Sequence, residues 1–254
     1  MIDDPLPRDW RDLQIGVCRL FNEVGLTAAI EVQLTTPRGT VTVDVHAVDE
    51  RSVDRINYIV ECKNWEAPIP QSIVHGFTTV MYETGANIGF IISKRGLQAG
   101  ARQYTRNTNM VGLTYEQLQA RYLQGWWRTV FCVGFGAAAD TLIQYVEPIN
   151  SRRERLLRKL PTSAQGALHA LQAKYGVFGM VAGMMSVGQH VPCFALNAPE
   201  SVEEFKARLT TALGDEFRFE SVYFRTLLDE MVGRVHAITM EFHDVFGANI
   251  FERP

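Results

Sequence analysis

The segment Tyr58–Trp65, with the sequence YIVECKNW, decides the fold of the N-terminal half of this chain. Its first three residues are aromatic or β-branched apolar residues, which are typical of a buried strand. Glu61 and Lys63 stand two residues apart at the end of this run. Because side chains alternate between the faces of a strand, both project from one face and Cys62 from the other. The sequence predicts a carboxylate and an ammonium at one site.

A second strand-like run, Thr40–Ala47, contains another carboxylate, Asp44. The two runs are separated by the polar stretch Asp49–Arg55, which is typical of a turn. A hairpin through this turn brings Asp44 beside Glu61 across the strand pair. We therefore expect two acids and a lysine at one edge of a sheet.

This combination of side chains suits a particular chemistry. Magnesium is a hard cation that takes one or two carboxylates and fills its other positions with water and phosphate oxygens. The ion lowers the pKa of a bound water and neutralises charge on a phosphoryl group, while an ammonium nearby stabilises the developing anion. Phosphodiester hydrolysis is the reaction that the three side chains fit best.

The alternative is an ordinary solvated ion pair on an edge strand, which contributes only ~0–1 kcal/mol. An acid two places before one of the five lysines is expected roughly half a time by chance in this composition. The apolar flank of the pair favours the functional interpretation, because a charge at the end of a buried strand is costly without a partner or a metal.

The order of elements resembles the PD-(D/E)xK nuclease superfamily and, within it, the Mrr-type restriction endonuclease catalytic domain. The resemblance covers roughly residues 8 to 120. The segments that carry it are an opening helix at Trp10–Gln14, Phe21–Leu26 leading into a strand, Val43–Val45, Val60–Trp65, a helix from about Ile69 to Thr84, the strand Ile88–Ser93, a helix from Gly96 to Thr105, and a short strand at Val111–Leu113. It implies a mixed sheet flanked by helices.

The resemblance also implies roles for the three charged residues. Asp44 and Glu61 become the metal-binding carboxylates, and Lys63 becomes the catalytic lysine. The implied cofactor is Mg²⁺, for which Mn²⁺ can substitute, and the implied substrate is DNA. Host defence against foreign DNA is implied in the same way.

Two further positions follow from the resemblance. Many relatives have a glutamate on the first helix that faces the metal, but here that position is Gln14, with Glu23 as a substitute about two and a half turns later. Gln71, at the start of the helix after Lys63, matches a glutamine that many relatives place near the active site. The amide at position 14 supports a second hypothesis, a nuclease-like module that binds nucleic acid or a partner protein without cutting.

A basic stretch follows the predicted site. No carboxylate occurs between Glu83 and Glu116. The basic residues that we expect to contact DNA phosphates there are Lys94, Arg95, Arg102 and Arg106. Arg102 and Arg106 are four residues apart and share a face if both are helical. The alternative is a plain solvated helix face.

Composition sets the outer limits. With 254 residues, 46% apolar and 21% charged, the chain is a soluble globular protein of one or two domains. We expect an endonuclease-like domain over residues 1–124 and a second domain over residues 125–254. The net charge of −3 is divided evenly between them, so nucleic acid must be bound by local patches. One nuclease site cuts one strand, so a homodimer is expected for double-strand cleavage.

The cysteines and the N-terminus exclude some classes of protein. Cys18, Cys62, Cys132 and Cys193 lie far apart and show no zinc-ligand spacing with each other or with the histidines. The first residues lack a basic start followed by an apolar stretch, so no signal peptide is visible and we expect a cytoplasmic protein. The apolar segment Tyr175–Leu196 is too interrupted for a membrane span.

The second half is less informative. Gly134–Ala139 matches a Gly-x-Gly-x-x-Ala turn of a dinucleotide site, but no second buried strand follows, so close helix packing explains it more simply. Residues 151–159 carry five basic side chains and one acid, which fits a second phosphate contact, a linker or an exposed helix face.

The remaining elements predict an α/β or α+β domain. They are helices at Thr162–Lys174, Ser201–Leu213 and Tyr223–Met231, with strands at Phe217–Phe219 and Val235–Met240. We interpret His236, Glu241, His243 and Asp244 as surface residues, not as metal ligands, because their spacing matches no known ligand geometry. Dimerisation, target recognition or sensing are all open roles for this domain.

Overall fold

The computed structural model describes residues 1–187 and 197–252. Cys193 and the end of the apolar segment Tyr175–Leu196 lie outside the described residues, so the interpretation of these parts stays a prediction. The chain forms two compact units, Met1–Trp126 and Trp127–Pro254, and each is described by itself.

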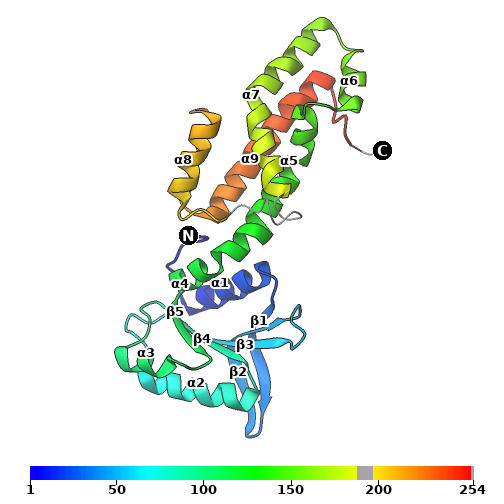
Figure 1. Cartoon of the computed structure of the whole chain (residues 1–254). Helices are drawn as coiled ribbons and strands as arrows, with labels where there is room; N and C mark the ends of the chain where they lie inside the picture. Colours follow the sequence, from blue (N-terminus) through cyan, green and yellow to red (C-terminus); the bar gives the residue numbers. More distant parts are fainter. Residues whose placement is uncertain (188–196, 253–254) are drawn as a thin grey trace. The chain divides into compact units, whose positions relative to one another are not determined.

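The first unit is built on one mixed sheet (Figure 1). Its strands are β1 (Thr27–Thr36), β2 (Gly39–Asp49), β3 (Ile56–Lys63), β4 (Ile88–Ser93) and β5 (Met110–Thr114), in that spatial order. The pairs β1–β2 and β2–β3 are antiparallel, whereas β3–β4 and β4–β5 are parallel. The hairpin and the succession of strands predicted from the sequence are therefore confirmed.

Helices cover both faces of this sheet (Figure 1). They are α1 (Trp10–Glu23), α2 (Gln71–Thr84), α3 (Ala99–Thr105) and α4 (Tyr115–Trp126). On one face the ring of Phe21 from α1 contacts Phe90 of β4 and Tyr122 of α4. On the other face, Val74 and Phe77 of α2 share a buried cluster with β3 and β4. The connection from β3 to β4 contains α2, and the connection from β4 to β5 contains α3. Both helices lie on one face of the sheet, because both crossovers are right-handed and move in the same direction across it.

The β1–β2 hairpin changes direction beside Asp44. The β2–β3 ladder ends at the pair Val45–Val60, and Glu31 on β1 has a φ of 52°. Beyond this point the hairpin no longer follows β3, and Val32 and Val43 pack against the α2 cluster instead. The strand that carries Asp44 therefore separates from β3 at the position of the acid.

Among the described residues of the second unit, the regular secondary structure is all helical. Its elements are the π-helical turn Trp127–Phe131, α5 (Cys132–Val146), α6 (Ser151–Leu157), α7 (Thr162–Val187), α8 (Val202–Leu213) and α9 (Phe224–Phe246). The expected helix at Ser201–Leu213 is present, with Ser201 accepting a hydrogen bond from the backbone N–H of Glu204 at 3.0 Å. This is the N-cap arrangement that its sequence predicts.

The expected strands of this unit are absent from the described residues, so the α/β interpretation of the C-terminal half was wrong. Val235–Met240 lies inside α9, and Phe217–Phe219 has no strand partner. The buried residues of α9 recur every three or four positions along the whole helix, which is the helical period. A six-residue window is too short to show that period.

Close helix packing explains one glycine of this unit, Gly179. Gly134 and Gly136 lie within α5 and form no dinucleotide turn. A methyl group at Gly179 of α7 would stand 2.6 Å from Val146 of α5, so only glycine allows the two helices to approach this closely. The continuous helical stretch Tyr115–Val146 meets the length and hydropathy of a membrane span, which is weak evidence because core helices meet the same test.

Candidate active site

The end of β3 brings Glu61 and Lys63 together on one face of the sheet. Their carboxylate and ammonium form an ion pair, and their side chains are 27% and 23% exposed. The parallel neighbour β4 places Ser93 opposite Lys63 in the ladder. The pair is therefore partly shielded but open on one side, as a site that admits a substrate must be.

Asp44 lies across from this pair, where the β2–β3 ladder ends. Its Oδ2 accepts a hydrogen bond from the backbone N–H of Cys62 at 2.6 Å. Its Oδ1 accepts one from Nε2 of Gln14 at 2.8 Å. A backbone strand and a helix thus fix both oxygens of this carboxylate.

Gln14 projects from α1 and is 2% exposed. Because an ionised carboxylate only accepts hydrogen bonds, the amide must turn its NH₂ group towards Asp44. Its Oε1 is then left with no hydrogen-bond partner among the residues that the structure describes. An unsatisfied buried oxygen costs ~1–3 kcal/mol, which points to a further group, such as a water or a cation, that belongs beside it.

Two other buried oxygens near the site share this property. Within the described ranges, Oγ of Ser93 and Oδ1 of Asn64 also lack partners. Ser93 is opposite Lys63 in the ladder, and Asn64 follows Lys63 in the chain. Unsatisfied acceptors therefore gather around the same three charged residues.

The electrostatics of the site keep Lys63 charged. Burial lowers the pKa of Lys63, but the hydrogen bond and charge of Glu61, together with the charge of Asp44, outweigh it and raise the pKa overall. At neutral pH this side chain is an ammonium. Burial, with the charges of Asp44 and Glu61, raises the pKa of the Cys62 thiol well above its usual value, so Cys62 is an unreactive core residue.

The donor set fits a hard divalent cation. The available oxygens are the carboxylates of Asp44 and Glu61 and the free Oε1 of Gln14. No group of three or more His, Cys, Asp or Glu residues forms a metal site in residues 1–187 and 197–252. Two carboxylates with water are nevertheless sufficient for Mg²⁺, which usually takes few protein ligands.

Two of the predicted site residues lie apart from this group. Glu23 accepts a hydrogen bond from the indole Nε1 of Trp126 at 2.8 Å, and it lies nine positions after Gln14 in α1, a rise of ~13 Å. We therefore leave Glu23 out of the proposed site. Gln71 is the first residue of α2, and its Nε2 lies 3.1 Å from Nε2 of His75, so it faces the next turn of its own helix.

The predicted basic edge is partly neutralised. Lys94 and Arg95 both pair with Glu66, an acid from the loop after β3. The sequence stretch lacks acids, but neighbouring parallel strands end at one edge of a sheet and bring the two loops together. This rule applied to β3 and β4 would have found Glu66.

Arg102 lies within α3, and Arg106 is the C-cap residue of this helix. Arg102 donates to the carbonyl of Leu97 at 3.2 Å. Arg106 lies beyond the end of α3 in an extended conformation, with φ of −63° and ψ of 136°. The shared face of the two arginines stays a prediction.

The N-terminal part of the chain matches a known family. Residues 8–121 match the family model of the Mrr catalytic domain, described as a restriction endonuclease. The comparison with curated proteins gave no match. A crystal structure described as a protein of unknown function is 17% identical with a TM-score of 0.35, and the match covers 40% of this chain and 57% of that chain.

Proposed function

We propose that this protein, whose residues 8–121 are an Mrr-type restriction endonuclease domain, is a Mg²⁺-dependent DNA endonuclease. The observation that supports it most is the group formed by Asp44, Glu61 and Lys63 at the end of β3. Residues 8–121 match the restriction endonuclease family, and we propose the metal, the substrate and the roles of the residues.

In this proposal Asp44 and Glu61 hold the cation, and Gln14 contributes through its free Oε1. When bound, the cation supplies a lowered pKa for a coordinated water and neutralises charge on the phosphoryl group. Lys63 keeps its proton and places a positive charge beside the phosphate as negative charge grows in the transition state. A water oxygen forms a bond to phosphorus, and the bond from phosphorus to one sugar oxygen breaks.

The hydrogen bonds of Asp44 define its part in the site. Gln14 and the Cys62 N–H hold its two oxygens from different elements, so the carboxylate stays oriented before any ligand arrives. Such preorganisation reduces the reorganisation that the reaction requires.

The test is cleavage of supercoiled plasmid in Mg²⁺ or Mn²⁺. We expect Asp44→Ala and Lys63→Ala to lower the cleavage rate by about 10²–10³-fold. Asp54→Ala and Lys174→Ala remove the same charges from exposed positions outside the site and are matched controls that keep full activity. Chelation of the metal should stop cleavage by every variant. Undiminished cutting by Asp44→Ala or Lys63→Ala would contradict the proposed roles.

Gln14 supports one alternative, a module that binds DNA or a partner protein without cutting. Many relatives have an acid at the position of Gln14. The amide of Gln14 instead donates a hydrogen bond to Asp44 and so stabilises that carboxylate without a metal. A wild-type protein that binds DNA but cuts it with neither metal would favour this alternative. Recovery of cutting in Gln14→Glu would then assign the loss to this one residue.

We propose further that the active form is a homodimer that acts on foreign DNA. One site cuts one strand, so a double-strand break requires a second copy. Linear plasmid as the first product supports the dimer, whereas accumulation of nicked circles supports independent sites.

A further inference from the structure

Four exposed basic residues gather in the segment of α6 in the second unit. Arg152, Arg155, Arg158 and Lys159 are all exposed, and Arg158 continues the helix with φ of −60° and ψ of −16°. At about 100° per residue Arg152, Arg155 and Arg158 fall within ~120° of one helix face, and Lys159 follows in the turn after it. We call these four residues the basic face of α6.

The fifth basic residue of this segment has a different role. Arg153 is 2% exposed and donates to the carbonyls of Gln144, Tyr145 and Glu147 at 3.3, 2.9 and 2.7 Å. These are the carbonyls at the C-terminal end of α5. Arg153 therefore caps α5 from α6 and fixes the short helix on it.

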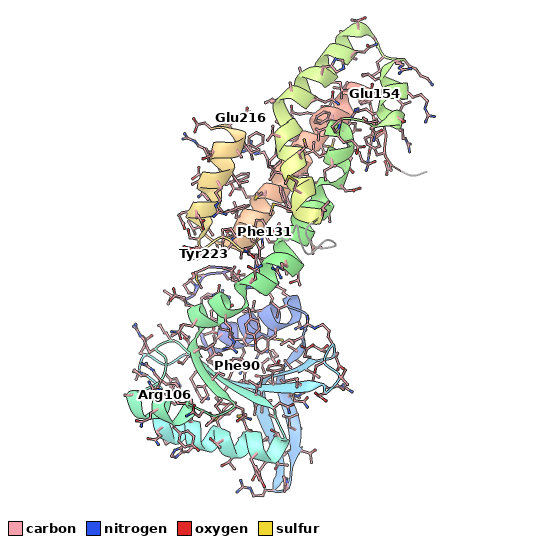
Figure 2. All side chains as sticks on the ribbon, in the orientation of Figure 1. Phe90, Arg106, Phe131, Glu154, Glu216 and Tyr223 are labelled. Atoms are coloured by element: carbon pink, nitrogen blue, oxygen red, sulfur yellow. The ribbon has the colours of Figure 1, made fainter. Side chains whose placement is uncertain are left out.

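The single acid of the segment is engaged in the same anchor. Glu154 accepts two hydrogen bonds from Arg153, at 3.2 and 2.9 Å, so its charge compensates the buried guanidinium. Figure 2 labels Glu154 on α6. Over the described parts of the chain, none of the four residues of the basic face forms an ion pair.

Some other cations of the same unit do have acidic partners. In the same unit Arg208 pairs with Glu204, and Arg218 pairs with Asp215. Like charges three or four residues apart on a helix repel each other, so the basic face is unfavourable without a polyanion. Beside it lies a hollow of about 300 Å³, lined by Ile149, Ser151, Glu154, Arg155 and Arg158.

We propose that the basic face of α6 binds the sugar-phosphate backbone of DNA, as a second contact outside the nuclease domain. The choice of DNA as the polyanion rests on the proposed function. Three of the four cations are arginines, whose planar guanidinium binds phosphate oxygens in pairs.

The dimensions of the face fit this partner. Arg152 and Lys159 are about 10 Å apart along the helix, and phosphates on one strand of a duplex recur every ~3.4 Å of its axis. The face therefore reaches about three phosphates. We assign these cations to phosphate oxygens, and contacts of that kind carry no sequence information directly.

The test measures binding of a short fluorescent duplex of mixed sequence by anisotropy, in a chelator so that no cleavage occurs. The full chain carries either Arg155→Gln with Arg158→Gln, or the control pair Arg208→Gln with Arg218→Gln. Both variants lose two positive charges from the same unit. We expect the first variant to bind ~10-fold more weakly at about 50 mM salt and to lose ~1.8 from the slope of log K against log salt, while the control changes less than about twofold.

Several outcomes would overturn the proposal. The first is equal DNA binding by the two variants. The second is a wild-type protein that binds no DNA. The third is a protein that binds phosphatidylglycerol vesicles through α6 but does not bind DNA. Circular dichroism of both variants checks that the helices remain folded.

The design also separates this inference from the proposed function. The same comparison in an Asp44→Ala background does not require catalysis. If DNA binding depends on α6 but the wild-type protein does not cut DNA, only the endonuclease proposal is contradicted. If the wild-type protein cuts DNA but its DNA binding does not depend on α6, only the proposed role of the basic face is contradicted.

Discussion

At the scale of single residues, the hydrogen bond between Gln14 and Asp44 couples the site to the stability of the first unit. In Gln14→Glu a second carboxylate would face Asp44 in a buried position, and repulsion would raise the pKa of one of the two acids in this variant. We expect the free energy of unfolding at pH 8 in a chelator to fall by ~1–3 kcal/mol, since a buried acceptor loses its donor.

Added Mg²⁺ should then stabilise Gln14→Glu more than it stabilises the wild type. Urea unfolding with and without the metal measures this difference. Gln14→Met, which loses the bond but gains no charge, is the control and should show no extra response. An identical response of both variants to Mg²⁺ would argue against a cation beside position 14.

A second prediction at this scale concerns Cys132, which is buried in α5. Burial raises the pKa of its thiol to about 12. The unfolded thiol ionises near its ordinary value of 9.0, so ionisation favours the unfolded chain above that pH. Stability should therefore be unaffected below pH ~9 and fall by up to ~1.4 kcal/mol per pH unit above it.

Urea unfolding at a series of alkaline pH values tests this. Cys132→Ala should show a shallower decline than the wild type, although its stability at neutral pH is lower. Cys18→Ala is the matched control, because Cys18 is less buried than Cys132. Parallel declines in all three proteins would show that Cys132 does not ionise on unfolding.

The residues of the candidate site were predictable to different degrees. Alternation along a strand predicted that Glu61 and Lys63 share a face, and the ion pair between them is present. The contact of Gln14 with Asp44 depends on how α1 packs on the sheet, so spacing in the sequence does not reveal it. The neutralising role of Glu66 was missed because it depends on which strand ends are neighbours.

At the scale of elements, the junction of α5 and α6 depends on Arg153. In Arg153→Met the α5 carbonyls lose this donor, although that of Tyr145 still accepts from Gln172, and Glu154 loses its partner. We expect the free energy of unfolding of the second unit to fall by ~2–4 kcal/mol, because these groups are partly or fully buried and the bonds involve a charge. Chemical unfolding followed by helical circular dichroism measures this loss.

Arg152→Met is the matched control, since Arg152 is exposed on the same helix. It should change stability by no more than ~0.5 kcal/mol. Comparable losses in the two variants would contradict the anchoring role of Arg153.

Glycines of the first unit provide another prediction for elements. At Gly112 of β5 a methyl group would lie 2.2 Å from Cδ1 of Leu97, so Gly112→Ala should cost ~1–3 kcal/mol through overpacking. At Gly76 of α2 nothing lies within 4 Å, and Gly76→Ala should stabilise the helix by ~0.5–1 kcal/mol. Thermal unfolding should shift in opposite directions for the two variants, and a shift in the same direction would contradict this packing.

The elements also show where prediction from sequence reaches its limit. The strand Ile88–Ser93 was predicted with its observed bounds, because a short apolar run between polar residues leaves little choice. In the second unit, the short apolar runs near residues 217 and 235 have no such distinct boundaries. Helix α9 is determined by its packing along 23 residues, which a local pattern does not reveal.

At the scale of the whole molecule, the net charge of −3 means that long-range attraction does not bring the protein to DNA. Local contacts and a second copy must supply the affinity in our proposal. We expect light scattering after size-exclusion chromatography to give twice the chain mass of 28.6 kDa at the concentrations that cleave plasmid. A mass of one chain together with double-strand cleavage would contradict the homodimer.

The separation of the two strands beside Asp44 has a consequence for every experiment on this residue. Backbone pairing between β2 and β3 ends at Val45 and Val60. The next hydrogen bond between the two strands is made by the side chain of Asp44, which accepts from the backbone N–H of Cys62. Truncating it therefore opens the sheet as well as removing a charge. Asp44→Asn keeps an oxygen that can accept the hydrogen bond from Cys62. If this variant loses cleavage but stays folded, the loss is due to the missing charge and not to a disrupted sheet.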